Sequence, residues 1–282
     1  KLTSYNGQTI TYDAIGNPLN DGAWTFTWAA GRQLKKMSRE GQALTFKYDH
    51  NGMRVQKVHE HSWYPETTSY TYHGKLLTHM VVDYTDWDEV GHIDEMHFFY
   101  DIASRPAIVN FNGEVFTYIQ NLQGDIVGIL DGTGALVVEY KYDAWGKLLK
   151  TTGSMADTLG KRNPFRYRGY VYDEEMEFYY LQSRFYSNRL MRFLNSDDVV
   201  YLSSHCSLKN AFSYCNLRPI MQKDKNGYIS EYAAEELIRE NADFIIAAAN
   251  EFDVDPQILA GVIYAEQTLN VDIIDTLTDW LG

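Results

Sequence analysis

Four segments of the chain share one pattern, in which an alternating strand ends in Tyr-Asp and is followed by a turn and a second alternating strand. They are Thr9 to Leu19, Leu44 to Val58, His97 to Val109 and Val137 to Lys150. The turns carry Gly16-Asn17, Asn51-Gly52 and Gly146, residue types that tolerate positive φ and permit tight reversal. The Asp carboxylate can accept backbone N–H bonds from the turn that follows it. Because such units cannot bury a face alone, the repeat predicts that they stack into a continuous β-sheet.

Further strands are expected between the repeats, at Trp24 to Met37, Tyr70 to Val81 and Phe116 to Val137. The 22 tyrosines and 6 tryptophans suit a pleated, half-buried sheet surface with the tyrosine hydroxyl at water. The repeat spacing is interrupted by Val82 to Glu95, which we expect to be an acidic loop. Lys150 to Lys161 is expected to be a polar connector.

The net charge of −13 argues against nucleic-acid binding by this chain, because a phosphate-binding surface needs a cationic face. No apolar run approaches the roughly 20 residues that a membrane span requires. The first residues lack the pattern of a signal peptide, but they begin inside a repeat and so say nothing about export.

The densest aromatic stretch is Arg162 to Asp198, where the repeats end. Two alternating runs, Arg166 to Asp173 and Glu177 to Ser187, flank an acidic turn at Asp173 to Met176. Five arginines are interleaved with the aromatic residues, namely Arg166, Arg168, Arg184, Arg189 and Arg192. Guanidinium groups stack on aromatic rings and pair with carboxylates. The stretch is therefore either a ligand-binding surface or an Arg–Tyr–Asp network that closes the end of a sheet.

Arg162 to Asp198 closely resembles the RHS-repeat-associated core, and the Tyr-Asp units resemble the YD repeats of RHS and teneurin-type proteins. The resemblance implies a mainly β fold, in which the YD-repeat sheet spirals as part of a hollow shell and is closed by the core. A small α-helical C-terminal segment would follow. It also implies three parts: a shell segment at 1–150, the core at 151–227, and the start of a variable C-terminal domain at 228–282.

Some members of this family release their C-terminal segment by aspartate-dependent self-cleavage, and the matching positions here are Asp197 and Asp224. Two neighbouring carboxylates can share a proton and act as acid and base at one peptide bond. The resemblance places the cut just after Gly227. In this chain Asp198 and Lys225 replace the family's prolines, and these prolines shape the approach of the preceding carboxylate. The alternative is that both aspartates stabilise turns.

After Gly227 the apolar period becomes helical, which predicts helices at Glu231 to Phe252 and Val254 to Val271. In the second helix, Asp255 is expected at the N-cap and Pro256 at the first helical position. This helix resembles the catalytic helix of lysozyme-like lytic transglycosylases, with Glu266 matching the general acid. The family's following serine is Gln267 here. The alternative is that Glu266 lies at the buried edge of a helix whose role is packing.

No cofactor or metal site is predicted. His59 and His61 lie on one strand face and could donate to a metal, but the sequence names no third ligand. The spacing of Cys206 and Cys215 matches no metal motif. The two residues form either a short-range disulfide or two free thiols.

Three hypotheses for function follow. The first is a structural and delivery scaffold of a secreted or cell-surface bacterial protein, which encloses or presents its own C-terminal effector domain and has an immunity protein as a further partner. The second is the start of a peptidoglycan-cleaving effector at 228–282. The third is an adhesive surface that binds carbohydrate through exposed aromatic side chains. This fragment itself is not expected to be an enzyme.

Overall fold

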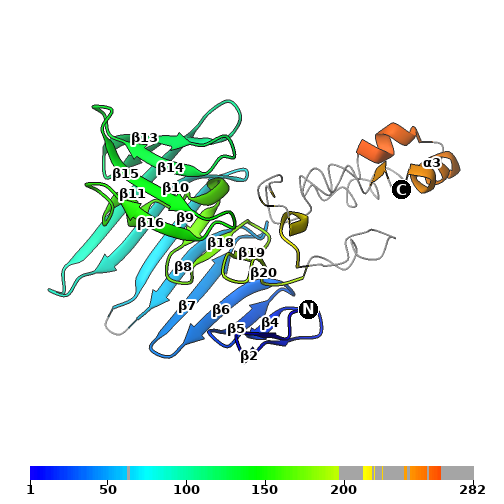
Figure 1. Ribbon diagram of the computed structural model, residues 1–282, viewed down its shortest axis with the longest axis horizontal. Helices are drawn as coiled ribbons and strands as arrows, with labels where there is room; N and C mark the ends of the chain where they lie inside the picture. The colour runs from blue at the N-terminus through cyan, green and yellow to red at the C-terminus, as the bar shows by residue number, and fades with distance from the viewer. Residues whose placement is uncertain are drawn as a thin grey trace. The chain divides into compact units, whose positions relative to one another are not determined.

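The computed structural model describes residues 1–61, 64–196, 212–217, 219, 224, 238–239, 242–252 and 254–261. The chain divides into two compact units, Lys1–Asn195 and Ser196–Gly282. Figure 1 shows the first unit as strands almost throughout, whereas the helix α3 (Ala242–Glu251) belongs to the second. The predicted mainly β fold is confirmed.

Fourteen strands of the first unit, among the residues described, form one antiparallel sheet in which each strand pairs with its neighbours in sequence. They are β3 (Thr11–Tyr12), β4 (Pro18–Asn20), β5 (Thr25–Ala29), β6 (Gln33–Arg39), β7 (Gln42–Tyr48), β8 (Arg54–Glu60), β9 (Glu66–His73), β10 (Leu76–Thr85), β11 (Gly91–Tyr100), β12 (Pro106–Phe111), β13 (Glu114–Gln120), β14 (Ile126–Leu130), β15 (Leu136–Tyr142) and β16 (Leu148–Thr152). A small hairpin, β1 (Ser4–Tyr5) and β2 (Gln8–Thr9), precedes them.

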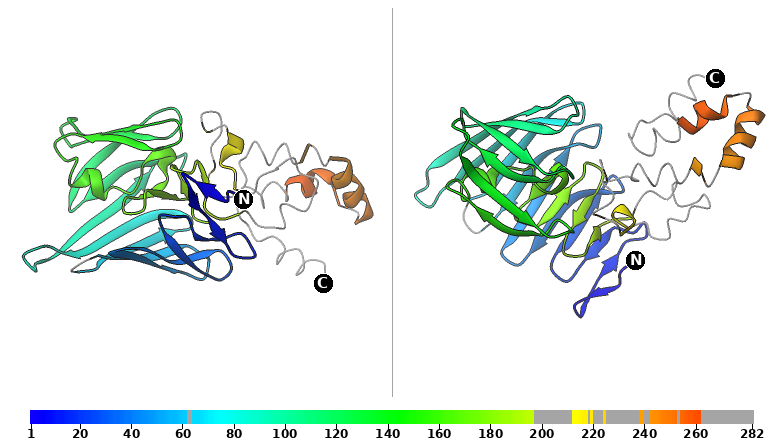
Figure 2. Two further views of the ribbon diagram at one scale, coloured as in Figure 1. Left: turned by 60° about the horizontal axis from the view of Figure 1, so that its bottom comes forward. Right: turned by 45° about the horizontal axis from the view of Figure 1, so that its top comes forward.

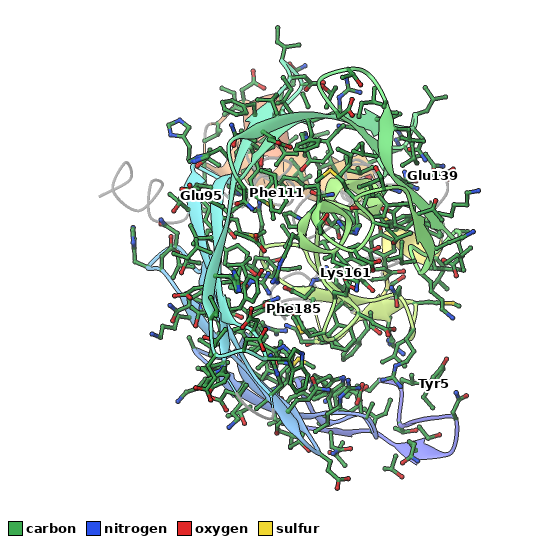
Figure 3. The ribbon with its side chains drawn as sticks, turned by 90° about the vertical axis from the view of Figure 1, so that its left-hand side faces the viewer. Tyr5, Glu95, Phe111, Glu139, Lys161 and Phe185 are labelled. Atoms are coloured by element: carbon green, nitrogen blue, oxygen red, sulfur yellow. The ribbon has the colours of Figure 1, made fainter. Side chains whose placement is uncertain are left out.

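A second, four-stranded sheet comes from the aromatic stretch. Its strands are β17 (Val171–Asp173), β18 (Phe178–Tyr180), β19 (Phe185–Ser187) and β20 (Arg192–Phe193), preceded by the helix α1 (Leu159–Arg162) and the 3₁₀ turn η1 (Tyr167–Gly169). The large sheet curves round this segment, so that the blue-to-cyan strands and the green strands face each other across it (Figures 2 and 3). We call the face of the large sheet that is turned towards the aromatic stretch the inner wall. Both hydrophobic clusters of the first unit join this wall to the aromatic stretch, one through Phe165 and the other through Phe178 and Phe185.

Seven turns of the large sheet share one hydrogen-bond pattern, in the described residues 1–61 and 64–196. Each begins at an acid or amide whose Oδ1 accepts the backbone N–H groups two and four residues later; at Asp49 these bonds are 2.9 and 2.8 Å. The residue three positions on has positive φ, as Gly52 does at 77°. The seven first residues are Asp13, Asp49, Asp86, Asp101, Asn121, Asp131 and Asp143. The predicted turn role of the Tyr-Asp aspartate is confirmed.

A β-bulge follows six of these turns, at the residue six positions after the turn's first residue. The ladder register skips Leu19, Val55, Ala107, Val127, Val137 and Leu149. A bulge places two residues opposite one, bends the strand and increases its twist. The recurring bulges therefore account for the curvature of the sheet.

The tyrosine of the repeat fixes neighbouring strands to one another at the turn edge. Tyr48 donates its hydroxyl to the carbonyl of Leu34 at 2.9 Å, and Tyr100 donates to that of Leu77 at 2.6 Å. Tyr142 bonds in the same way to Ile126, at 2.8 Å. In these three cases the acceptor lies near the start of the preceding strand, so the aspartate of the pair closes a turn and the tyrosine joins two neighbouring strands. Tyr12 differs, because its hydroxyl donates to the Leu2 carbonyl, outside the strands.

Two local predictions for the first unit were wrong. Val82 to Glu95 is not a loop, because it forms the outer halves of β10 and β11, whose register runs without a break from His79 opposite His97 to Thr85 opposite Gly91. Asp86 makes the repeat turn there with Glu89 at positive φ in place of glycine, which hid the turn. The start of the run at Arg166 is the turn η1 rather than a strand, since Arg168 has a φ of 58° and donates its N–H to Asp125 at 2.8 Å.

In the second unit, α3 falls within the first predicted helix. Gln257 donates its N–H to Asp255 Oδ1 at 2.7 Å and helical residues start at 256, so the predicted N-cap is confirmed. Cys215 is buried within the unit, and Cys206 lies outside the described residues. Among the helices described, none is long and apolar enough to cross a membrane.

Candidate functional site

A buried ion pair joins the large sheet to the four-stranded sheet of the same unit. Arg54, the first residue of β8, places Nη1 2.6 Å from Asp173 Oδ2 and Nη2 3.1 Å from Asp173 Oδ1. The side chains are 0% and 1% exposed. This two-pronged geometry is the strongest form of a guanidinium–carboxylate contact.

Aromatic rings enclose the Arg54 guanidinium. Its centre lies 4.5 Å from the Tyr180 ring and 4.8 Å from the Tyr70 ring. The Tyr180 hydroxyl also accepts the backbone N–H of Arg54 at 3.0 Å. Cation–π attraction is strongest where water is excluded, so the rings offset part of the desolvation cost of the buried charge.

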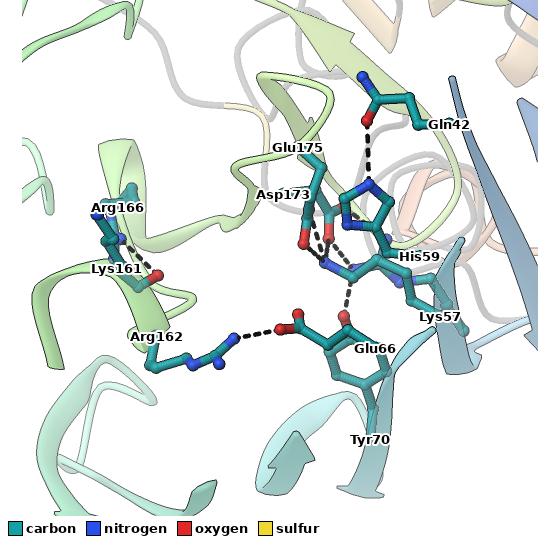
Figure 4. Close-up of polar contacts among 11 residues, drawn as sticks. Gln42, Lys57, His59, Glu66, Tyr70, Lys161, Arg162, Arg166, Asp173 and Glu175 are labelled. Atoms are coloured by element: carbon teal, nitrogen blue, oxygen red, sulfur yellow. Dashed lines mark hydrogen bonds and ion pairs between the residues drawn. The ribbon is translucent and has the colours of Figure 1, made fainter. Parts of the chain in front are cut away.

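Lys57 extends the network to a second carboxylate (Figure 4). Its ammonium lies 3.3 Å from Asp173 Oδ1 and 2.9 Å from both oxygens of Glu175. Burial opposes the charge on each group, but the Lys57 ammonium outweighs it and lowers the pKa of Glu175 to about 2. The pKa of Lys57 is raised, because Glu175 outweighs burial there as well.

A second ion cluster fixes α1 to the wall. Arg162 donates from Nη1 to Glu66 at 2.7 Å and from Nε to Asp94 at 2.8 Å. Its guanidinium stacks 4.4 Å from the centre of the Tyr84 ring. Helix α1 is thereby tied to β9, β10 and β11 by a single side chain.

A polar cleft of about 570 Å³ lies between these two ion clusters. It is lined by His59, Glu66, Tyr84, Asp94, Phe111, Asn112, Met155, Asp157, Thr158, Lys161, Arg162, Glu174 and Glu175. His59 contacts the Gln42 amide at 3.0 Å, and burial raises the pKa of the Glu174 carboxyl. Most charged groups of the lining pair with one another, an arrangement suited to anchoring rather than to proton transfer or nucleophilic attack.

The other arginines of the aromatic stretch also have structural contacts. Arg166 is buried, its Nη2 donates to the Gly160 carbonyl, and its guanidinium lies 4.3 Å from the Tyr140 ring centre. Arg168 is buried over Tyr167, and Arg184 lies 3.6 Å from the Phe193 ring centre. Arg189 pairs with Asp21 at 2.6 Å. The geometry supports the network interpretation of this stretch over the ligand-binding one.

Of the predicted catalytic residues, only Asp224 falls within the described part of the chain. It is buried in the second unit. Asp197 and Glu266 lie outside the described residues, so the self-cleaving pair and the general acid stay predictions. His59 and His61 do lie together, with ring centres 4.7 Å apart.

Sequence reasoning missed Arg54 and Lys57, because a period of two places residues three apart on opposite faces of a strand. The bulge at Val55 restores them to one face. After the turns at Asp101 and Asn121 the equivalent positions are buried and apolar, Pro106 with Val109 and Ile126 with Ile129. Aligning the repeats would have shown two cations in inward positions, a signal that each has a buried acidic partner.

No family model matches the chain. In sequence it is similar to the tRNA3(Ser)-specific nuclease WapA of Bacillus spizizenii, with 34% identity over 233 residues. It is also similar to the tRNA nuclease WapA of Bacillus subtilis, with 36% identity over 231 residues. Each match covers 81% of this chain, and the chain spans 9% of the length of each relative.

In structure the chain is similar to the complex TcdB2-TccC3-Cdc42, with a TM-score of 0.63 and 18% identity over 77% of this chain and 11% of that one. It is also similar to a Photorhabdus luminescens Tc holotoxin pore that contains TccC3, with a TM-score of 0.64 and 16% identity over 77% of this chain and 10% of that one. At these identities the likeness shows the fold. None of these comparisons supports the lysozyme-like prediction for the tail, because the relatives similar in sequence are named as nucleases.

Proposed function

We propose, from the premise that the chain is a segment of an RHS-family protein, that it forms the part of a toxin shell in which the closing core is locked to the inner wall. Its function is to hold and present a C-terminal effector domain of the same protein. The observation that carries this proposal is the buried Arg54–Asp173 pair, which fixes the core to a strand 119 residues earlier in the sequence.

The effector that we propose is a nuclease, because the relatives similar in sequence are named as tRNA nucleases. The cleaving domain would lie in the part of the protein that this chain does not cover, since the chain spans 9% of the length of each relative and its net charge of −13 as a whole is unsuited to binding RNA phosphates. This replaces the peptidoglycan-cleaving hypothesis and its wall partner. The protein would be secreted or held at the cell surface, and its producer would carry an immunity protein against the effector.

Limited proteolysis of the full-length parent protein tests the enclosure. An epitope tag is placed at the C-terminus of the effector, and its loss is followed over time in the wild type and in Arg54→Ala. We expect protection in the wild type and faster loss in Arg54→Ala, because the core can then leave the wall. Arg105→Ala, which removes an exposed ion pair with Asp101, is the matched control and should behave as the wild type.

Equal cleavage rates for the effector alone and for the effector within the wild-type parent would contradict enclosure. The nature of the effector is tested separately, by incubating the released effector with bulk tRNA and, in parallel, with peptidoglycan. Degradation of the peptidoglycan alone would contradict the nuclease proposal and leave the enclosure result unaffected.

We also propose that Asp197 and Asp224 release the effector by cutting the chain after Gly227. The support is the match of both positions to the family's aspartate pair, and Asp224 is buried in the second unit. On a denaturing gel, the purified chain should give two fragments, and Asp197→Asn should give one. A single intact band of 32.6 kDa from the wild type would contradict the proposal.

A further inference from the structure

Three side chains that can bind a metal ion meet on the outer face of the large sheet, across β10 and β11. His79 and His97 are direct partners in the ladder, and Glu95 lies two residues before His97 on the same face. Met80 and Met96, which alternate with them, are buried on the inner wall. The three polar side chains therefore project away from the core, with exposed fractions of 29% for His79, 51% for Glu95 and 47% for His97.

The ligand atoms are already close to one another. Nε2 of His79 lies 2.8 Å and Nε2 of His97 lies 3.5 Å from the same carboxylate oxygen of Glu95. All three ligand atoms lie within 4.8 Å of one another. The ligands of a tetrahedral zinc ion, with bonds of about 2.0–2.2 Å, lie about 3.4 Å apart. Small side-chain rotations are enough to reach that arrangement.

The backbone under these side chains is held in place. The N–H of Glu95 donates to Asn112 Oδ1 at 2.7 Å, and the Glu95 carbonyl accepts the N–H of Asn112 at 3.0 Å. The ladder between β10 and β11 continues for six further residue pairs beyond the one formed by His79 and His97. A metal site on paired strands is better organised than one on a loop, so little ordering cost remains for binding.

We propose that His79, Glu95 and His97 form a binding site for a divalent transition-metal ion of the class that imidazole binds well, with Zn²⁺ as its representative. Two neutral imidazoles and one carboxylate are ligands typical of zinc and leave a fourth position open to water. The ion would crosslink β10 to β11 on the outer surface, away from the buried network that holds the core.

Calorimetric titration of the full chain with ZnCl₂ at neutral pH tests the site. The wild type should bind Zn²⁺ saturably with one ion per chain at this site, and its Tm should rise with zinc and fall again with EDTA. His79→Gln and His97→Gln should each weaken binding at least about tenfold. Mutation of a residue that only hydrogen-bonds to a metal ligand already weakens metal affinity by about that factor. His92→Gln is the matched control, because His92 lies on β11, as His97 does, but its ring bonds to Asp86.

His97 is exposed and His79 is only partly buried on the outer face, so these variants should fold, and far-ultraviolet circular dichroism checks this. Co²⁺ is the second probe, since its visible absorption reports nitrogen ligands, and the signal should vanish in the double variant His79→Gln/His97→Gln. Absence of saturable Zn²⁺ binding in the wild type would overturn the proposal. Binding that survives in the double variant would also overturn it and would point to His59 and His61.

Discussion

Arg54 carries its charge in a position that water does not reach. Five contacts compensate for the lost hydration: two bonds to Asp173, one to the Tyr70 hydroxyl, and the faces of the Tyr70 and Tyr180 rings. Such a pair is strongly destabilising when only one partner is removed, because the other charge stays buried. The pair thus makes docking of the core depend on one correct contact, which apolar packing alone would not do.

Arg54→Ala should lower the free energy of unfolding by about 3–5 kcal/mol, because it leaves Asp173 buried without its main partner. Urea denaturation of the full chain measures this. The double variant Arg54→Met/Asp173→Leu should recover most of the loss, since no lone charge remains. Arg105→Ala is the control at an exposed pair and should cost less than about 1 kcal/mol. A loss in the double variant as large as in Arg54→Ala would contradict the role given to the buried charge.

At the scale of the element, the repeating turn is a device in which each position has a separate physical role. The aspartate satisfies two backbone donors, the residue three positions later takes positive φ, and the bulge three residues further on turns the strand. Asn121 shows that an amide oxygen can replace the carboxylate oxygen, with bonds of 2.9 and 3.0 Å. The turn therefore needs an acceptor at this position and not a charge.

Asp49→Ala should destabilise the chain by about 1–3 kcal/mol, because two backbone N–H groups lose their acceptor. Asp49→Asn should stay within about 0.5 kcal/mol of the wild type, as expected for a change that keeps the oxygen in place. Thermal unfolding of both variants, followed by circular dichroism, decides between the two roles. Equal destabilisation by alanine and asparagine would mean that the charge of Asp49, rather than its oxygen, stabilises the turn.

The elements that the sequence predicted well are those with local causes. Tyr-Asp followed by glycine was enough to place the turns at Asp13, Asp49 and Asp143, and Asp255-Pro256 was enough to place a helix start. The β10–β11 hairpin was missed because Thr85 rather than tyrosine precedes Asp86, and Glu89 stands where five of the other six turns have glycine. The bulge at Val55 was missed because no residue type marks a bulge by itself.

At the scale of the whole molecule, the closure of the sheet round the core rests on contacts between distant parts of the chain. Arg54 and Asp173 are 119 residues apart, and Arg162 and Glu66 are 96 apart. No local pattern encodes such pairs, so the sequence predicted a core that closes the sheet but not which side chains join it to the wall. Only Asp173 to Met176, predicted as an acidic turn, pointed to the correct region.

The first unit should lose stability in acid through Glu175. Its pKa is lowered from 4.5 to about 2, so its contribution is fully present above pH 4.5 and is lost as the pH falls towards 2. Urea denaturation between pH 6 and pH 2 should show this loss in the wild type, and a smaller dependence in Glu175→Gln, which has no carboxylate to protonate. An identical pH dependence in the two proteins would contradict the lowered pKa of Glu175.

The bulges, placed at the same offset after six of the turns, make curvature a property that accumulates along the chain. Each added unit contributes its own increment of bending and needs no adjustment in units already present. Duplication or loss of a unit would therefore change the circumference of the wall in whole steps.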